Sequence, residues 1–184
     1  MARKYPSITF TDSVRAAQAD HGAAEVAARV EAMQVQDDRF SENEKLFIRA
    51  RDSFYMASVN EDGWPYIQHR GGPLGFLKVT GDRSLAFADF SGNRQYISTG
   101  NIRHDDRVAL FLMDYPNRTR LKLMLRSEIL DAAEHPDLLE LVQDSSYKAR
   151  IERIVQFKLE AFDWNCPQHI TPRFTEQEWS ERQD

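Results

Sequence analysis

Two stretches of the chain, residues 63–78 and 89–94, place cations and glycines around the ends of predicted strands. Arg70 and Lys78 supply positive charge of the kind that binds a phosphate, and the three glycines between them let the backbone come close to a flat ligand. Gly92-Asn93-Arg94 opens a predicted helix over about 94–101, and a helix N-terminus itself attracts anions. Any one of these glycines or arginines is more often part of a tight turn, but their combination indicates a site for a phosphorylated cofactor.

A second set of cations alternates along the predicted strand over 120–130. It consists of Arg118, Arg120, Lys122 and Arg126. Such a face is most often solvated, although it could bind nucleic acid or lie at a subunit contact or beside a cofactor. A cation near the pyrimidine edge of a flavin would stabilise the negative charge that appears on reduction, and Arg120 and Lys122 are the candidates for that role.

The residue spacing gives little support for a metal site, a nucleophilic pair or a known nucleotide-binding motif. None of the five histidines has metal-ligand spacing to a second strong ligand, so no metal site is expected. Cys166 and His169 are three residues apart, but no acidic residue accompanies them to orient the histidine, which argues against a nucleophilic pair. P-loop, dinucleotide-binding and nucleophile-elbow motifs are absent from the sequence.

The composition is that of an ordinary globular protein. Hydrophobic residues make up 41% of the 184 residues and charged residues 29%. The net charge of −5 argues against a nucleic-acid partner, and no apolar run approaches the roughly 20 residues that span a membrane. One cysteine favours a reducing compartment, so we expect a cytoplasmic protein without a membrane partner.

Residues 1–45 are predicted to form a helical arm. Asp12 or Ser13 can cap a first helix that His21-Gly22 ends. Ser41 and Glu44 have the spacing of a capping box, which starts a further helix. These helices are expected to cover the fold and not to perform chemistry.

Residues 46–162 change to short strands with hairpin spacing, which predicts a small antiparallel barrel. The fold class is therefore mainly β with flanking helices (α+β). Leucines alternate along 120–130 and should face the core. The predicted strands cover residues 53–59, 64–69, 76–79, 85–88, 108–113, 120–130 and 154–162, and further helices cover about 94–101 and 136–143.

Residues 163–184 form a C-terminal arm, which completes one domain with the two segments before it. Residues 162–173 combine Trp, Asn, Gln, His and Arg between prolines that favour an extended chain. We prefer an ordered arm laid across a neighbouring subunit. An arm packed on its own chain is the alternative.

Residues from about Phe47 to Leu130 resemble the flavin-binding split barrel of the pyridoxamine 5′-phosphate oxidase superfamily. The resemblance rests on the hairpin that ends in residues 69–78 (His-Arg-Gly-Gly-Pro-Leu-Gly-Phe-Leu-Lys) and on Gly92-Asn93-Arg94 before a helix. The strands over 106–111 and 120–130 follow in the family's order. The segment from Trp164 to Arg173 is similar to that of a subgroup described only as pyridoxamine-phosphate-oxidase-like.

This resemblance implies a six-stranded split barrel that forms a homodimer with two FMN molecules at the subunit interface. It places Arg70 and Lys78 near the FMN phosphate or ring edge, Asn93-Arg94-Gln95 on the phosphate, and Asp89-Phe90 beside the flavin. Gln168 and His169 would come from the partner chain. The expected cofactor-binding residues are His69, Arg70, Gly71, Gly72, Lys78, Asp89, Phe90, Asn93, Arg94, Gln95, Arg120, Lys122, Gln168 and His169.

The chain differs from the authentic oxidase in the segments that matter most for substrate binding. The oxidase's C-terminal Trp…Arg-Leu-x-Pro segment has no match, and Gly71-Gly72-Pro73 is not the oxidase pattern. The resemblance therefore implies FMN binding more strongly than vitamin B6 oxidation.

The leading hypothesis is an FMN-dependent oxidoreductase that takes hydride from a small-molecule substrate or a nicotinamide nucleotide, with no catalytic residue identified. The alternative is a non-catalytic flavin- or tetrapyrrole-binding protein, because this barrel hosts both kinds. A nucleic-acid binder that uses the basic strand is a third hypothesis, and the acidic charge argues against it.

Overall fold

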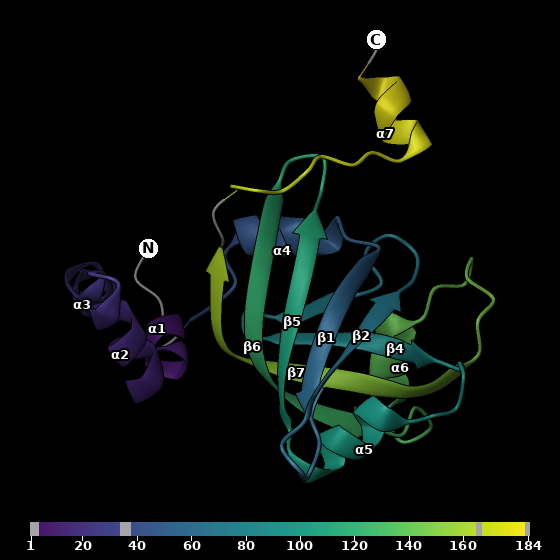
Figure 1. Ribbon diagram of the computed structural model, residues 1–184. Coiled ribbons are helices and arrows are strands. Elements are labelled where there is room, and N and C mark those ends of the chain that lie inside the picture. Colours follow the sequence, from purple (N-terminus) through teal and green to yellow (C-terminus); the bar gives the residue numbers. More distant parts are fainter. Residues whose placement is uncertain (1–3, 34–37, 165–166, 183–184) are drawn as a thin grey trace.

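The computed structural model describes residues 4–33, 38–164 and 167–182, and shows one curved antiparallel sheet with helices around it (Figure 1). The strands are β1 (Ser53–Val59), β2 (Pro65–Gly71), β3 (Lys78–Gly81), β4 (Ser84–Phe90), β5 (Arg107–Asp114), β6 (Thr119–Leu130) and β7 (Ile151–Trp164). The helices are α1 (Tyr5–Thr9), α2 (Asp12–Asp20), α3 (Ala24–Ala32), α4 (Glu42–Arg49), α5 (Ile97–His104), α6 (Pro136–Val142) and α7 (Glu176–Glu181). The predicted class, mainly β with flanking helices, is confirmed.

The strand order is β2-β1-β5-β6-β7-β4-β3, with β2 and β3 at the two edges. The six strands implied by the family resemblance are wrong for this chain, since the sheet has seven. The short strand β3 overlaps the predicted segment 76–79 and pairs with β4 in a hairpin, so all seven predicted strand segments belong to the sheet. Because strand pairing does not join β2 to β3, the sheet curves around the core without closing.

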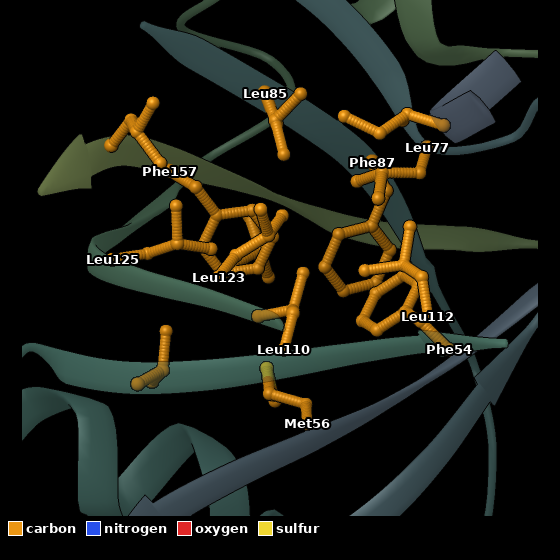
Figure 2. Packing of buried hydrophobic residues seen from close by; sticks show 14 of the residues in the cluster. Phe54, Met56, Leu77, Leu85, Phe87, Leu110, Leu112, Leu123, Leu125 and Phe157 are labelled. Carbon is orange, nitrogen blue, oxygen red and sulfur yellow. The ribbon is translucent and has the colours of Figure 1, made fainter. Parts of the chain in front are cut away.

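The core lies inside this curve, where side chains from the central strands meet (Figure 2). Leu121, Leu123 and Leu125 of β6 are fully or almost fully buried, as the alternation predicts. Phe87 of β4 lies edge-on to Phe54 of β1, with ring centroids 5.4 Å apart, so the core joins strands that are far apart in the sheet. This packing fixes the spacing of the strand ends that carry the site.

The N-terminal helices begin where side chains satisfy their first backbone N–H groups. The cap of α2 is Thr11, whose hydroxyl accepts a hydrogen bond from the Val14 N–H, and not Asp12 or Ser13 as expected. The capping box of Ser41 and Glu44 at α4 is confirmed. No helix among the described residues is long and apolar enough to cross a membrane.

The carboxylate of Glu44 also fastens α4 to the last strand. Its Oε1 accepts a 2.7 Å hydrogen bond from Trp164 Nε1, and the Trp164 ring packs edge-on against Phe47 at 4.7 Å. Burial raises the pKa of Glu44, but hydrogen bonds from Ser41 and Trp164 outweigh that effect and hold the pKa below its ordinary value. The strand β7 therefore runs to Trp164, two residues beyond the predicted end.

Candidate functional site

Most of the residues expected at the phosphate lie together at the ends of β2 and β4 and in the loop before α5. They line a pocket of about 150 Å³, called here the phosphate pocket. Its lining residues are Tyr66, Gln68, Arg70, Asp89, Phe90, Gly92, Asn93, Arg94, Gln95, Tyr96, Ile97, Ser98, Thr99, Glu152 and Arg153. The structure thus brings together Arg70, Asp89, Phe90 and the run Asn93-Arg94-Gln95.

A buried carboxylate holds two of the pocket's arginines. Asp89 Oδ1 accepts a 2.9 Å hydrogen bond from Arg70 Nη1, and Asp89 Oδ2 lies 3.3 Å from Arg153 Nε. Burial raises the pKa of Asp89, and the charges of Arg70 and Arg153 oppose that rise. Since β2 and β4 are not paired, the Arg70–Asp89 contact connects strands from opposite ends of the sheet.

The Arg70 guanidinium is only partly satisfied by Asp89. Its side chain is 17% exposed, and its Nε is buried with no hydrogen-bond partner in the described part of the chain. A buried donor without an acceptor is costly, so this nitrogen is suited to an acceptor that the protein itself does not supply.

The loop before α5 is strained. Arg94 and Tyr96 have positive φ angles of 62° and 54°, in the left-handed region that is unfavourable for residues with a Cβ. The Asn93 side chain accepts a hydrogen bond from the Gln95 N–H within this loop. The sequence predicted that this helix begins near Arg94. These angles explain why α5 begins at Ile97 instead.

The first turn of α5 still lines the pocket, through Ile97, Ser98 and Thr99. Ser98 donates a 3.0 Å hydrogen bond to Gln68 Oε1 on β2, and this contact fixes the glutamine side chain at the pocket wall. One turn later, Asn101 donates a buried 3.0 Å hydrogen bond to Ser58 on β1. Both contacts hold the helix against the sheet.

Glu152 and Arg153 are pocket residues that the sequence did not predict, because the last strand was expected to begin at residue 154 and begins at Ile151. The register of the sheet pairs Arg153 with Asp89, and a contact over 64 residues of sequence carries no local periodic signal. Arg153 also donates to the Thr99 hydroxyl at 3.2 Å, and its guanidinium lies 4.8 Å from the Tyr96 ring centroid. It contacts the Glu152 carboxylate as well.

Glu152 places a second negative charge in the pocket. Burial raises the pKa of Glu152, but the hydrogen bond and charge of Arg153, with hydrogen bonds from Ser91 and Tyr96, hold that pKa below its ordinary value. The pocket therefore combines the three cations of Arg70, Arg94 and Arg153 with two carboxylates. The net positive charge favours an anion.

Three other predicted residues lie beside the pocket and do not line it. His69 points to the opposite face of β2 from Arg70, where its ring is 5.5 Å from that of Tyr55. A Cβ on Gly71 would come within 3.1 Å of the His69 ring, and one on Gly72 within 2.7 Å of the Phe76 ring. Gly72 therefore has a packing reason within this chain to be glycine.

The cations predicted on other strands lie elsewhere. Lys78 pairs with Ala86 at the β3 edge, outside the pocket lining. On β6, Lys122 forms a 3.1 Å ion pair with Asp163 and lies 4.9 Å from the Tyr5 ring, while Arg120 pairs with Met113 of β5. Neither of these β6 residues lines the phosphate pocket.

Gln168 and His169 are exposed on the C-terminal arm, which crosses the sheet at the end away from α5 (Figure 1). The arm contacts its own chain through Arg173, whose guanidinium lies 5.1 Å from the Tyr115 ring centroid. Residues 167–182 of the arm thus do not line the phosphate pocket of the same chain. Cys166 lies outside the described residues, and no group of three or more potential metal ligands occurs within them.

Comparison with known proteins finds a matching family model and solved structures with a similar fold. Residues 40–163 match the family model described as pyridoxamine 5′-phosphate oxidase. No curated protein matches the chain.

Solved structures share the fold at low sequence identity. An FMN-binding protein from Syntrophomonas wolfei is 16% identical, with a TM-score of 0.53 over 68% of this chain and 85% of that one. A candidate pyridoxamine 5′-phosphate oxidase from Lactobacillus delbrueckii is 19% identical, with a TM-score of 0.52 over 70% and 97%. HupZ from group A Streptococcus is 14% identical, with a TM-score of 0.51 over 73% and 99%.

The strained loop predicts an unusual stability effect at Arg94. Replacing it with glycine should raise the free energy of unfolding by about 1 kcal/mol relative to Arg94→Ala, because glycine has no Cβ to strain at positive φ. Urea denaturation measures the difference. Arg118, which is exposed and has a φ of 53° in the turn between β5 and β6, should respond in the same way. A glycine variant no more stable than the alanine variant would contradict the loop conformation.

Proposed function

The chain belongs to the pyridoxamine 5′-phosphate oxidase family, and we propose that it is an FMN-dependent oxidoreductase whose cofactor phosphate binds in the phosphate pocket. The observation that carries this proposal is the buried Nε of Arg70, which has no acceptor among the described residues. A phosphate oxygen is the acceptor that suits a guanidinium best. Arg94 and Arg153 would bind the remaining phosphate oxygens, and the Ser98 and Thr99 hydroxyls lie on the same wall.

The size of the pocket supports a cofactor that extends out of it. Its volume of about 150 Å³ suffices for a phosphate but not for a ring system, since ligand pockets usually measure about 300–1,000 Å³. The rest of the cofactor would need further walls. We propose that a second copy of the chain supplies them in a homodimer.

The outer face of the sheet supports such a dimer. Ile67 on β2 is 65% exposed, and Tyr55, Ala57 and Phe111 continue an apolar surface across β1 and β5. Apolar surfaces of this kind are typical of contacts between subunits. His69 lies on this face, so it would be near the proposed contact, and Gln168 and His169 would come from the partner's C-terminal arm.

When bound, FMN supplies hydride-transfer chemistry, and the protein has to bind and orient it. The arginines would hold the phosphate. Gln68, whose side chain accepts a hydrogen bond from Ser98, would face the sugar-alcohol chain of FMN next to the phosphate. We propose a small-molecule substrate or a nicotinamide nucleotide as the hydride donor. We also propose that the protein is located in the cytoplasm, because a single cysteine favours a reducing compartment.

FMN should bind more tightly than riboflavin, which lacks the phosphate. Arg94→Ala removes a charge-assisted contact typically worth about 1.5–3 kcal/mol, so FMN affinity should fall roughly tenfold or more while riboflavin affinity stays the same. Titration calorimetry measures both ligands, with Arg118→Ala as the control at another positive-φ arginine. Equal affinity for FMN and riboflavin would remove the phosphate assignment.

Anaerobic reduction of the bound flavin distinguishes an oxidoreductase from a protein that only binds flavin. An oxidoreductase should lose its flavin absorbance band on addition of a nicotinamide nucleotide or another donor from a panel, and regain it in air. Stopped-flow absorbance measures the rate, with free FMN as the control. A bound flavin that no donor reduces faster than free FMN would favour the non-catalytic binding protein.

Deleting residues 165–184 tests the proposed role of the C-terminal arm. The cut follows Trp164 because its indole belongs to the folded barrel. Cooperative unfolding should persist, while loss of packing on the flavin should weaken FMN binding about tenfold or more and raise its fluorescence. Full affinity with an unchanged flavin spectrum would mean that Gln168 and His169 do not reach the cofactor.

A further inference from the structure

A second groove adjoins the phosphate pocket, on the other side of Arg153. It has a volume of about 550 Å³ and lies between α5 and the first residues of β7. Arg103, Arg150 and Arg153 line it together with one carboxylate, that of Glu152. The groove is thus larger than the phosphate pocket and carries a higher net positive charge.

The guanidinium groups of two of these arginines have no polar partner in the part of the chain that the structure describes. Arg103 and Arg150 are exposed, and among the described residues neither guanidinium forms an ion pair or a hydrogen bond. Arg103 stands in the last turn of α5, where a cation suits the helix dipole, but that effect gives no role to Arg150. On a chain with a net charge of −5, three arginines around one groove form a local anion-binding surface.

Gly100 forms part of the groove wall and has no side chain there. It lies inside α5, where glycine is destabilising relative to alanine. A Cβ built on it would meet no protein atom within 4 Å, so packing within the chain does not require glycine there. The bare backbone at this point would let a ligand approach the helix closely.

Arg153 connects the groove with the phosphate pocket. Tyr96, Thr99, Glu152 and Arg153 line both. The Arg153 guanidinium is fixed between Asp89, Thr99 and the Tyr96 ring. An anion in the groove and an anion in the phosphate pocket would therefore both contact the Arg153 guanidinium. Two phosphates of one nucleotide, or the phosphates of two neighbouring ligands, can bind an arginine in this way.

We propose that this groove is a second phosphate subsite, which takes a phosphoryl group of a nucleotide next to the phosphate in the phosphate pocket. That group has two sources: the adenylyl half of a dinucleotide flavin, or the diphosphate of a separate nucleotide. The identity of the neighbouring phosphate rests on the proposed function. Anion binding by Arg103 and Arg150 does not.

The test is calorimetry with FMN, FAD and ADP on the wild type and on the double variant Arg103→Gln/Arg150→Gln, with Arg118→Gln as the control. Both changed residues are exposed, so the fold should be retained, and a thermal scan checks this. ADP affinity should fall at least tenfold in the double variant and stay unchanged in the control. FMN affinity should change by less than twofold in both.

The same titrations distinguish the two sources. FAD that binds more tightly than FMN, and loses this advantage in the double variant, identifies a dinucleotide flavin. FAD no tighter than FMN, with ADP binding to the FMN-loaded protein, identifies a separate nucleotide. Unchanged ADP and FAD affinities in the double variant would overturn the inference. Variant-sensitive ADP binding without any FMN binding would refute the proposed function and leave this subsite standing.

Discussion

The site depends on one buried carboxylate, Asp89, which binds Arg70 of β2 and Arg153 of β7. The sheet has its two edges at β2 and β3, and no strand pairing joins the β2 end to β4. Asp89 brings the two arginines together across that gap, and its charge makes their partial burial tolerable in the absence of a ligand. The same carboxylate leaves Arg70 Nε without a partner, and this incomplete satisfaction is the feature that favours an anion.

Strain and charge occur at the same place. Arg94 and Tyr96 are in the left-handed region in a loop that lines the pocket, and the first turn of α5 follows directly. Backbone strain of this kind persists where the surrounding contacts impose it, and it is often found at binding sites. Here the contacts from Ser98 to Gln68 and from Asn101 to Ser58 hold α5 in place and so fix the loop before it.

Local sequence patterns predicted those parts of the fold that have local causes. The alternating leucines of β6 and the capping box at α4 are such cases, and both are confirmed. The predicted start of α5 is wrong because no residue preference indicates the two positive φ angles, at Arg94 and Tyr96, on either side of Gln95. Arg153 was missed because its role comes from its pairing with Asp89, and register between distant strands is set by the assembled sheet. Of the predicted phosphate residues, Arg70 and the run 93–95 do line one pocket, because the Arg70–Asp89 contact brings the ends of β2 and β4 together, whereas Lys78 lies outside it.

The phosphorus-31 NMR spectrum of FMN bound to this protein, followed from pH 8 to pH 5, tests the central claim most directly. A free phosphate monoester takes up its second proton with a pKa of about 6, which moves the resonance. If Arg70, Arg94 and Arg153 bind the phosphate, they stabilise the dianion, and the resonance should stay at its dianion position across this range. A resonance that titrates near pH 6, as that of free FMN does, would place the phosphate in solvent and contradict the account.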